Sequence, residues 1–285
     1  MRFGLPINKL EGQLTYGGYL KVNELLNLQN LLSEPAQHDE TLFIIIHQVY
    51  ELWFKQMLHE LDTVVEKFNN GDVLGAIRLI RRCIEIQRVL VSQVAVLETM
   101  TPMDFLAFRD NLMPASGFQS TQFREFEFAC GIKDASFLNF FDEGTEERKR
   151  LQKRLQNPSL PDAFFALLNR RGFEVGEKRE GEAAEAYHAR VKEMMRIYQE
   201  ADKHYDLFLL AESLIEFDEA VILWRFRHTK MAERMIGSKI GTGGSEGVAY
   251  LQSTTTQKFF PELWELRTYL SNATGGCPMH GSTSS

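Results

Sequence analysis

Apolar residues recur every three or four positions along several long stretches of the chain, and this spacing predicts helices with one buried face. The clearest stretch runs from His38 to Phe68, lacks Gly and Pro, and begins with Asp39 as a candidate N-cap. A second helix is predicted from about residue 72 to residue 98, after a break at residues 69–72. The apolar positions of the first stretch are Phe43, Ile46, Tyr50, Phe54, Met57, Leu58 and Leu61.

Shorter segments continue the helical pattern. Thr101-Pro102 is typical of a helix start, with proline at the first helical position. Further helices are expected over residues 121–131, over residues 182–236 as one long helix or two, and on both sides of Pro261 near the end. Before the first long helix, residues 15–20 suggest a turn and residues 23–31 a short helix, while the more polar residues 132–180 suggest surface helices and loops.

Strand-like alternation is nearly absent, so the chain is predicted to be all-α, with one domain built as a bundle of long antiparallel helices. The domain is expected to cover residues 1–271. Residues 1–35 would form an N-terminal arm with a short helix, and the small, polar residues 272–285 would form a disordered tail.

Composition narrows the classes of function. The chain has 285 residues and a net charge of −7 (32 − 39) without a basic tract, which argues against nucleic acid or an anionic membrane surface as a partner. The first residues lack the apolar core of a signal peptide, and no apolar run is long enough to span a membrane. Three widely spaced cysteines suggest a reducing cytoplasm.

Two histidines have strongly apolar neighbours, and either one fits a hydrogen-bonded core residue or a ligand. His47 follows Phe-Ile-Ile-Ile, and His228 follows Trp-Arg-Phe-Arg late in a predicted helix. The chain lacks HExxH, CxxCH and repeated carboxylate–histidine pairs, which leaves non-covalent haem with one axial histidine as the metal site to consider. Suitable cations for haem propionates near His228 are Arg225, Arg227, Lys230 and Arg234.

Two further features fit a small-molecule site. Arg109 follows two phenylalanines on a short predicted helix, where it could bind a substrate carboxylate or form a surface ion pair. The glycine-rich residues 237–247 lack the ending of a phosphate-binding loop. They could close on a ligand or simply connect two helices.

Several long motifs resemble the tryptophan 2,3-dioxygenase family, and the resemblance covers nearly the whole chain. Residues 132–200 match least. The motifs are LTYGGYL (14–20), HDETLFIIIHQVYELWFKQMLHELD (38–62), LETMTPMDFLAFRDNLMPASGFQS (97–120), WRFRH (224–228) and GSKIGTGGSEGVAYLQST (237–254).

The resemblance implies a cytoplasmic, all-helical homotetramer that uses ferrous haem b and O2. Such an enzyme opens the pyrrole ring of L-tryptophan to give N-formylkynurenine, the first step of the kynurenine pathway. His228 would be the proximal ligand of the haem iron, with Trp224 also in contact with the haem. His47 would accept a hydrogen bond from the indole N–H on the distal side, Arg109 would bind the substrate carboxylate, and Thr242 would contact the substrate as its loop closes.

The same resemblance assigns the substrate's surroundings. Phe43 and Phe105 would line the indole pocket, and Tyr16, Tyr19 and Leu20 would cover the pocket of a neighbouring subunit.

Two departures from the family pattern keep alternatives open. Phe105 lacks the hydroxyl of the Tyr found in some members, and Glu246 stands where a Ser is common. A related haem oxygenase for a modified tryptophan or another indole, with mono-oxygenation as a variant, is therefore the second hypothesis. A non-catalytic haem carrier is the third, although it would not need Arg109 and Thr242.

Overall fold

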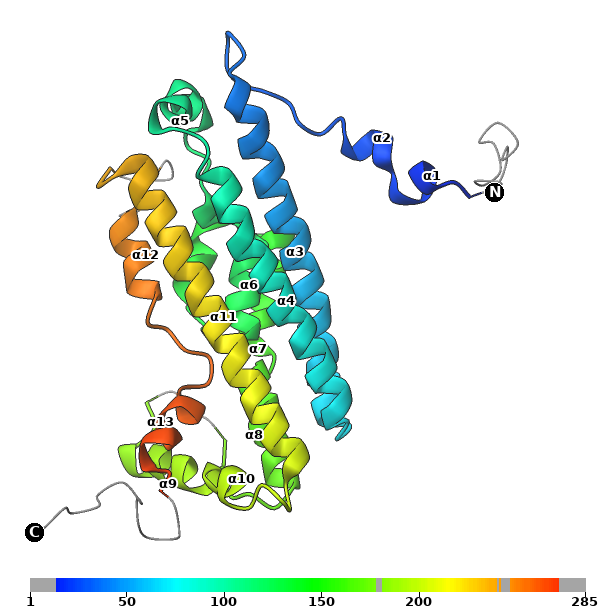
Figure 1. The fold of residues 1–285 in the computed structure, drawn as a ribbon, viewed down its shortest axis with the longest axis vertical. Coiled ribbons are helices and arrows are strands. Elements are labelled where there is room, and N and C mark those ends of the chain that lie inside the picture. Colours follow the sequence, from blue (N-terminus) through cyan, green and yellow to red (C-terminus); the bar gives the residue numbers. More distant parts are fainter. Residues whose placement is uncertain (1–13, 178–180, 240, 242–246, 272–285) are drawn as a thin grey trace, which may run out of the picture.

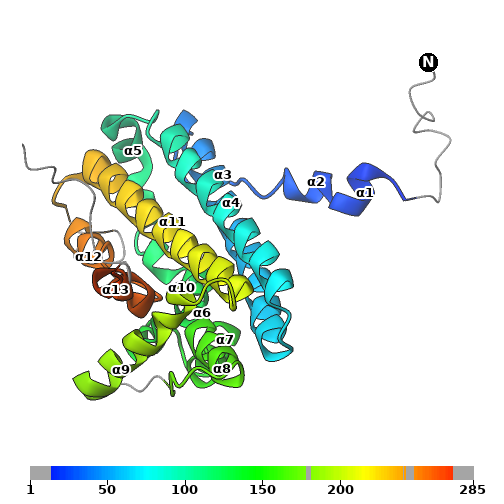
Figure 2. The same cartoon turned by 60° about the horizontal axis from the view of Figure 1, so that its bottom comes forward.

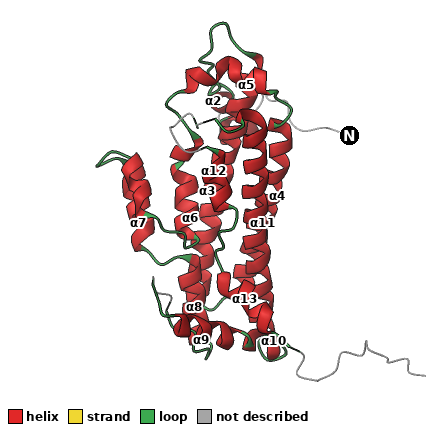
Figure 3. Ribbon diagram, turned by 90° about the vertical axis from the view of Figure 1, so that its left-hand side faces the viewer, coloured by secondary structure: helices red, strands yellow, loops and turns green. Residues whose placement is uncertain are grey.

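The computed structural model describes residues 14–177, 181–239, 241 and 247–271, and in these residues it contains helices and loops but no strand (Figure 3). This confirms the all-α prediction. Within the described chain no single helix is long and apolar enough to cross a membrane. Only one bent pair, Val73–Leu97 with Pro102–Leu112, meets the length and composition criteria together.

Three long helices form the centre of the bundle: α3 (His38–Asn69), α4 (Val73–Leu97) and α11 (Tyr205–Ile236). α3 runs antiparallel to the other two, as predicted, but α4 and α11 run in the same direction (Figure 1). The short turn after α3 reverses the direction of the chain. The long segment between α4 and α11 brings the chain back to the end of the bundle where α4 begins, so α11 runs in the same direction as α4.

The apolar stripe of α3 has a buried part and a partly accessible part. Ile46 and the residues from Phe54 to Leu61 on this stripe are buried, whereas Phe43 and Tyr50 are partly accessible. The N-cap of α3 is Gln37 rather than Asp39, which lies in the first turn beside the positive end of the helix.

The next helix, α5 (Pro102–Arg109), starts as its sequence predicts. The Thr101 side chain accepts from the backbone N–H of Asp104, and the Asp104 carboxylate accepts from the backbone N–H of Thr101. α5 lies at 90° to α4 and crosses one end of the bundle (Figure 1).

Residues 132–180 were predicted to form surface helices and loops, but part of this segment is buried. α8 (Leu160–Arg170) packs against α3 and buries its apolar residues, among them Phe164, Phe165 and Leu168. The segment 182–236 forms three helices rather than one or two. The remaining elements are α6 (Thr121–Ala129), α7 (Glu146–Gln156), α9 (Ala184–Met194), α10 (Arg196–Gln199), α12 (Val248–Thr254), α13 (Pro261–Tyr269) and the 3₁₀ turns η2 (Asp110–Leu112), η3 (Gly117–Gln119) and η4 (Ala135–Phe140).

The described part of the N-terminal arm, residues 14–35, carries α1 (Tyr16–Leu20) and α2 (Val22–Leu25) and extends away from the bundle (Figures 1 and 2). Two predictions for this segment were wrong. Residues 16–20 form a helix rather than a turn, because the Thr15 hydroxyl caps it by accepting from the Gly18 N–H. The predicted helix over 23–31 ends at Leu25.

A buried carboxylate holds the last helix in place. Asp218 of α11 is 1% exposed, and it accepts hydrogen bonds from the backbone N–H groups of Phe259 and Phe260 and from the indole N–H of Trp264. These contacts connect α11 with the residues that begin α13.

We expect Asp218→Ala to lower the free energy of unfolding by about 3–5 kcal/mol, because two buried backbone donors and the partly buried indole N–H lose their acceptor. Urea denaturation monitored by circular dichroism measures this loss. Glu219→Ala, a change at the adjacent exposed position of the same helix, is the control and should leave stability near that of the wild type. An equal loss in both variants would contradict the anchoring role.

Candidate functional site

A cavity of about 300 Å³ lies where α3, α5, α6, α11 and α12 meet. Most of its surface is apolar. Its lining includes Phe43, His47, Tyr50, Glu51, Phe54, Phe105, Arg109, Ser116, Phe118, Phe123, Arg124, Glu127, Trp224, Arg225, His228, Met231, Met235, Gly241, Gly247, Tyr250 and Thr254.

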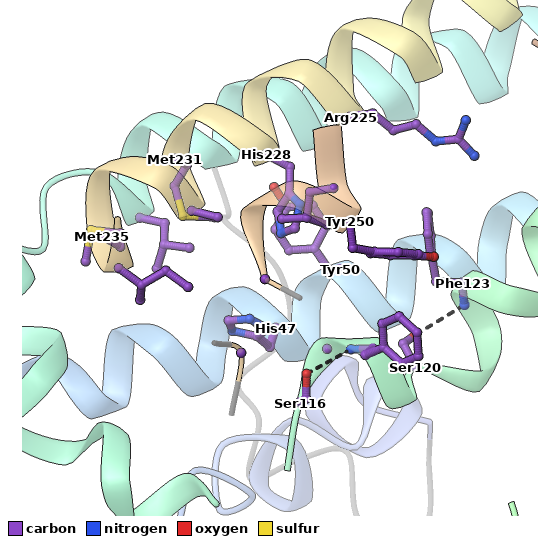
Figure 4. A pocket seen from close by; sticks show the side chains of 18 of the residues that line it. His47, Tyr50, Ser116, Ser120, Phe123, Arg225, His228, Met231, Met235 and Tyr250 are labelled. Carbon is purple, nitrogen blue, oxygen red and sulfur yellow. Dashed lines mark hydrogen bonds between the residues drawn. The ribbon is translucent and has the colours of Figure 1, made fainter. Parts of the chain in front are cut away.

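Two histidines reach this cavity from different helices, His47 from α3 and His228 from α11 (Figure 4). The Nδ1 of His47 lies 2.7 Å from the carbonyl oxygen of Phe43. Because a carbonyl only accepts, Nδ1 carries the proton and donates, which leaves Nε2 as an acceptor. Burial lowers the pKa of His47, opposed by the Phe43 carbonyl and the Glu51 carboxylate, so the neutral form is favoured.

His228 has a different environment. Burial lowers the pKa of His228 to about 4, and neighbouring His47 adds to the shift. The imidazole makes no hydrogen bond to any residue that the structure describes, and it stacks on Trp224, one turn earlier in α11. A neutral imidazole in an apolar cavity is the form of histidine that binds a metal.

Three phenylalanines form an apolar wall beside His47. The ring centroid of Phe43 lies 4.1 Å from that of His47 and 5.6 Å from those of Phe105 and Phe108. Phe43 and Phe105, which line the cavity, therefore offer flat, apolar surface next to a hydrogen-bond acceptor, which suits an aromatic ligand with one N–H group.

Arg109 follows Phe108 in the sequence and is the last residue of α5. Its side chain is 14% exposed and lines the cavity, and its Nη1 lies 3.9 Å from the carboxylate of the exposed Asp110. A largely buried guanidinium at a cavity wall is suited to a carboxylate ligand.

A buried ionic cluster at the cavity was not predicted from the sequence. Glu127 accepts from Arg124 at 2.6 Å and from Arg225 at 2.8 Å, and Arg124 also donates to the hydroxyl of Tyr250 at 3.2 Å. Two cations and one anion leave a positive excess here. The signal in the sequence was the presence of charges three residues apart within the Phe-rich helix α6.

Glu51 was not predicted as a site residue either, although it follows His47 by four positions and so shares its face of α3. Its carboxylate accepts from the hydroxyl of Ser120 at 2.6 Å and from the amide of Gln122 at 2.8 Å. These hydrogen bonds fasten the start of α6 and the preceding cavity-lining loop, which contains Ser116, to α3.

Most of the cations predicted around His228 lie elsewhere. Arg227 and Arg234 pair with Glu98 at the end of α4, and Lys230 pairs with Glu233, whereas Arg225 lines the cavity. The helical period explains this outcome, since residues one, two and six positions from His228 lie on other sides of α11.

The predicted residues of the arm do not reach the cavity of their own chain. Tyr16, Tyr19 and Leu20 lie on α1 with exposed fractions of 80%, 70% and 46%. Thr242 and Glu246 lie outside the described residues, as does the tail with Cys277 and its neighbours.

Two residues of the glycine-rich segment, Gly241 and Gly247, line the cavity. Gly247 has a φ of 61°, and a Cβ atom there would lie 2.7 Å from the carbonyl oxygen of Lys239. The close approach of Gly247 to the backbone of Lys239 therefore requires glycine at this position.

The family model and the similar proteins all carry the same description. The family model described as tryptophan 2,3-dioxygenase matches residues 4–174 and 141–270. Proteins named tryptophan 2,3-dioxygenase from Nocardioides sp., Herpetosiphon aurantiacus and Caulobacter vibrioides are 48%, 46% and 42% identical to the chain. The alignments cover 90%, 89% and 90% of this chain and 95%, 97% and 98% of those proteins.

We expect the neutral form of His47 to predominate at pH 6.5, with its proton on Nδ1, because desolvation lowers its pKa and the Phe43 carbonyl accepts from that nitrogen. ¹⁵N-labelled histidine and long-range ¹H–¹⁵N NMR spectra measure both properties, and the spectrum of His47→Gln assigns the signal. An Nε2–H tautomer, or a half-protonated ring above pH 6.5, would contradict this assignment.

Proposed function

Because the chain belongs to the tryptophan 2,3-dioxygenase family, we propose that it is a haem-dependent enzyme that opens the pyrrole ring of L-tryptophan with O2 to give N-formylkynurenine. One observation carries the proposal for this chain's own residues. A neutral His228, the acceptor nitrogen of His47 and the guanidinium of Arg109 all line one apolar cavity.

The residues of the cavity fit haem b. His228 would ligate the iron, since its imidazole is neutral and has no hydrogen-bond partner among the described residues. Trp224 and Met231 offer apolar surface on the same helix. The positive excess of Arg124 and Arg225 over Glu127 suits the negative charge that propionates bring into a buried site.

When bound, the haem would supply the activation of O2, and the protein would supply orientation and electrostatics. The indole would pack against Phe43 and Phe105, and its N–H would donate to Nε2 of His47. Because Nδ1 is already protonated and bonded to a carbonyl, His47 can hold the indole N–H without removing its proton. This agrees with a reaction in which oxygen attacks the ring before any N–H deprotonation.

Recognition of the amino-acid part of the substrate would fall to Arg109 and to the glycine-rich loop. A zwitterion that enters an apolar cavity must have its charges paired. Arg109 would bind the carboxylate as a planar fork, and Thr242 would contact the ammonium and carboxylate groups.

The arm supports an oligomeric enzyme. Its large apolar side chains, Tyr16 and Tyr19 among them, are exposed in the single chain, which is typical of a surface that binds another protein. We therefore include a cytoplasmic homotetramer in the proposal, in which Tyr16, Tyr19 and Leu20 cover the cavity of a neighbouring subunit.

We expect the haem-loaded, anaerobically reduced protein to convert L-tryptophan and O2 to N-formylkynurenine with both atoms of one O2 in the product. Mass spectrometry after reaction with labelled O2 measures this. Incorporation of one labelled atom, or turnover of a modified indole but not of L-tryptophan, would favour the related oxygenase instead. A haem-loaded protein that is inert toward every indole would refute both enzyme hypotheses and favour the non-catalytic haem carrier.

We expect Arg109→Ala to lower kcat/KM for L-tryptophan chiefly through a higher KM, because the buried carboxylate loses its charged partner. The loss should be about 2–5 kcal/mol, or roughly 30-fold and more in kcat/KM. Steady-state kinetics with L-tryptophan measure it, and tryptamine, which lacks the carboxylate, should be turned over equally by both proteins. Arg234→Ala, at an exposed position of α11, is the control. An unchanged KM in Arg109→Ala would refute the role of this residue.

A further inference from the structure

Trp224 is an aromatic neighbour of His228 on the same helix. The two residues are four positions apart on α11, their ring planes differ by 12°, and their centroids lie 5.3 Å apart. Trp224 is 7% exposed. The stack therefore occupies one face of the imidazole and limits its rotation about the Cβ–Cγ bond.

Other aromatic rings hold Trp224 in turn. Phe54 meets it edge-on at 6.2 Å and 88°, and Phe123 packs at 5.2 Å. Tyr50 packs at 6.2 Å and donates its O–H to the carbonyl oxygen of Leu90 on α4 at 2.8 Å. Rings from α3 and α6, together with the backbone of α4, thus define where the indole of Trp224 lies.

The hydroxyl of Tyr50 is a stable donor. Burial raises the pKa of Tyr50 to about 12. The nearby indole N–H of Trp224 partly offsets this rise, because it stabilises the ionised phenolate. That N–H is buried and lies outside hydrogen-bond geometry with the described residues. Aromatic packing by Tyr50, Phe54 and Phe123 therefore positions Trp224.

Histidines that bind metals usually donate their second N–H to a carboxylate or a carbonyl, which fixes the ring orientation and raises the basicity of the ligand. His228 has no such partner in the described part of the chain. The stack on Trp224 can orient its ring instead.

We propose that Trp224 is a positioning residue that orients the axial imidazole of His228 by stacking, in place of a hydrogen-bonded partner. The inference rests on the proposed function, because it takes His228 as the iron ligand. Without a carboxylate to polarise it, the imidazole is a weaker electron donor, which favours ferrous over ferric iron. Ferrous iron is the state that the proposed reaction uses.

The test compares Trp224→Leu, which removes the ring, with Trp224→Phe, which retains a flat ring, in the haem-loaded ferrous protein. Resonance Raman spectra report the iron–histidine stretching band, and transfer of haem to excess apomyoglobin reports the rate of haem loss. Trp224→Leu should broaden the band and speed haem loss by about tenfold. Trp224→Phe should stay close to the wild type.

Two further variants separate a positioning role from general damage. Phe226→Leu, the same kind of change at a 49% exposed position of α11, should alter neither measurement. Tyr50→Phe, which removes only the hydrogen bond to Leu90, should broaden the band slightly. It also provides a test if Trp224→Leu fails to fold.

An iron–histidine band and a rate of haem loss in Trp224→Leu equal to those of the wild type would overturn the inference. So would equal broadening in Phe226→Leu. His228→Ala tests the underlying assignment separately, because persistence of the wild-type band in that variant would reject His228 as the ligand whatever Trp224 does.

Discussion

The placement of two uncharged imidazoles, His47 and His228, at one mostly apolar cavity is the condition on which the rest of the site depends. A protonated His228 could not ligate a metal, and a protonated His47 could not accept a hydrogen bond through Nε2. Burial lowers the pKa of both residues, to about 4 for His228. The packing of α3, α4 and α11 therefore sets the chemistry of the cavity as well as the stability of the bundle.

The same apolar surroundings require that each buried charge has a partner. Glu127 lies between Arg124 and Arg225, and Asp218 accepts from two backbone N–H groups and an indole. In the low dielectric of the interior, paired charges attract each other strongly, and an unpaired charge would lower the stability of the fold. In the proposed function, the excess cation at the cavity and the guanidinium of Arg109 would bind the anionic groups of ligands.

The sequence predicted features that depend on local rules. The apolar period of α3 and the proline at the start of α5 act within a few turns, so their signals are contained in the segment itself. The parallel course of α4 and α11 and the burial of α8 depend on partners far along the chain, and no local pattern contains them. The cations predicted beside His228 failed for a related reason, since Arg227 and Arg234 face Glu98 of another helix. The roles of His47, His228 and Arg109 came from motif resemblance, and the structure adds the cavity that all three line, together with Glu51 and Arg124.

α3 links the parts of the proposed site that lie far apart in sequence. Near its start, the buried carboxylate of Glu40 accepts from the backbone N–H groups of Leu32 and Ser33, and Gln48 bonds to the side chain of Gln29. These contacts fix the base of the arm against the helix that also carries His47. One turn beyond His47, Glu51 holds the loop before α6. Any shift of α3 would therefore move the distal acceptor, the cavity-lining loop and the origin of the arm together. In the proposed oligomer, the exposed aromatic side chains of the arm would meet a neighbouring copy, so the geometry of α3 would relate assembly to completion of the cavity.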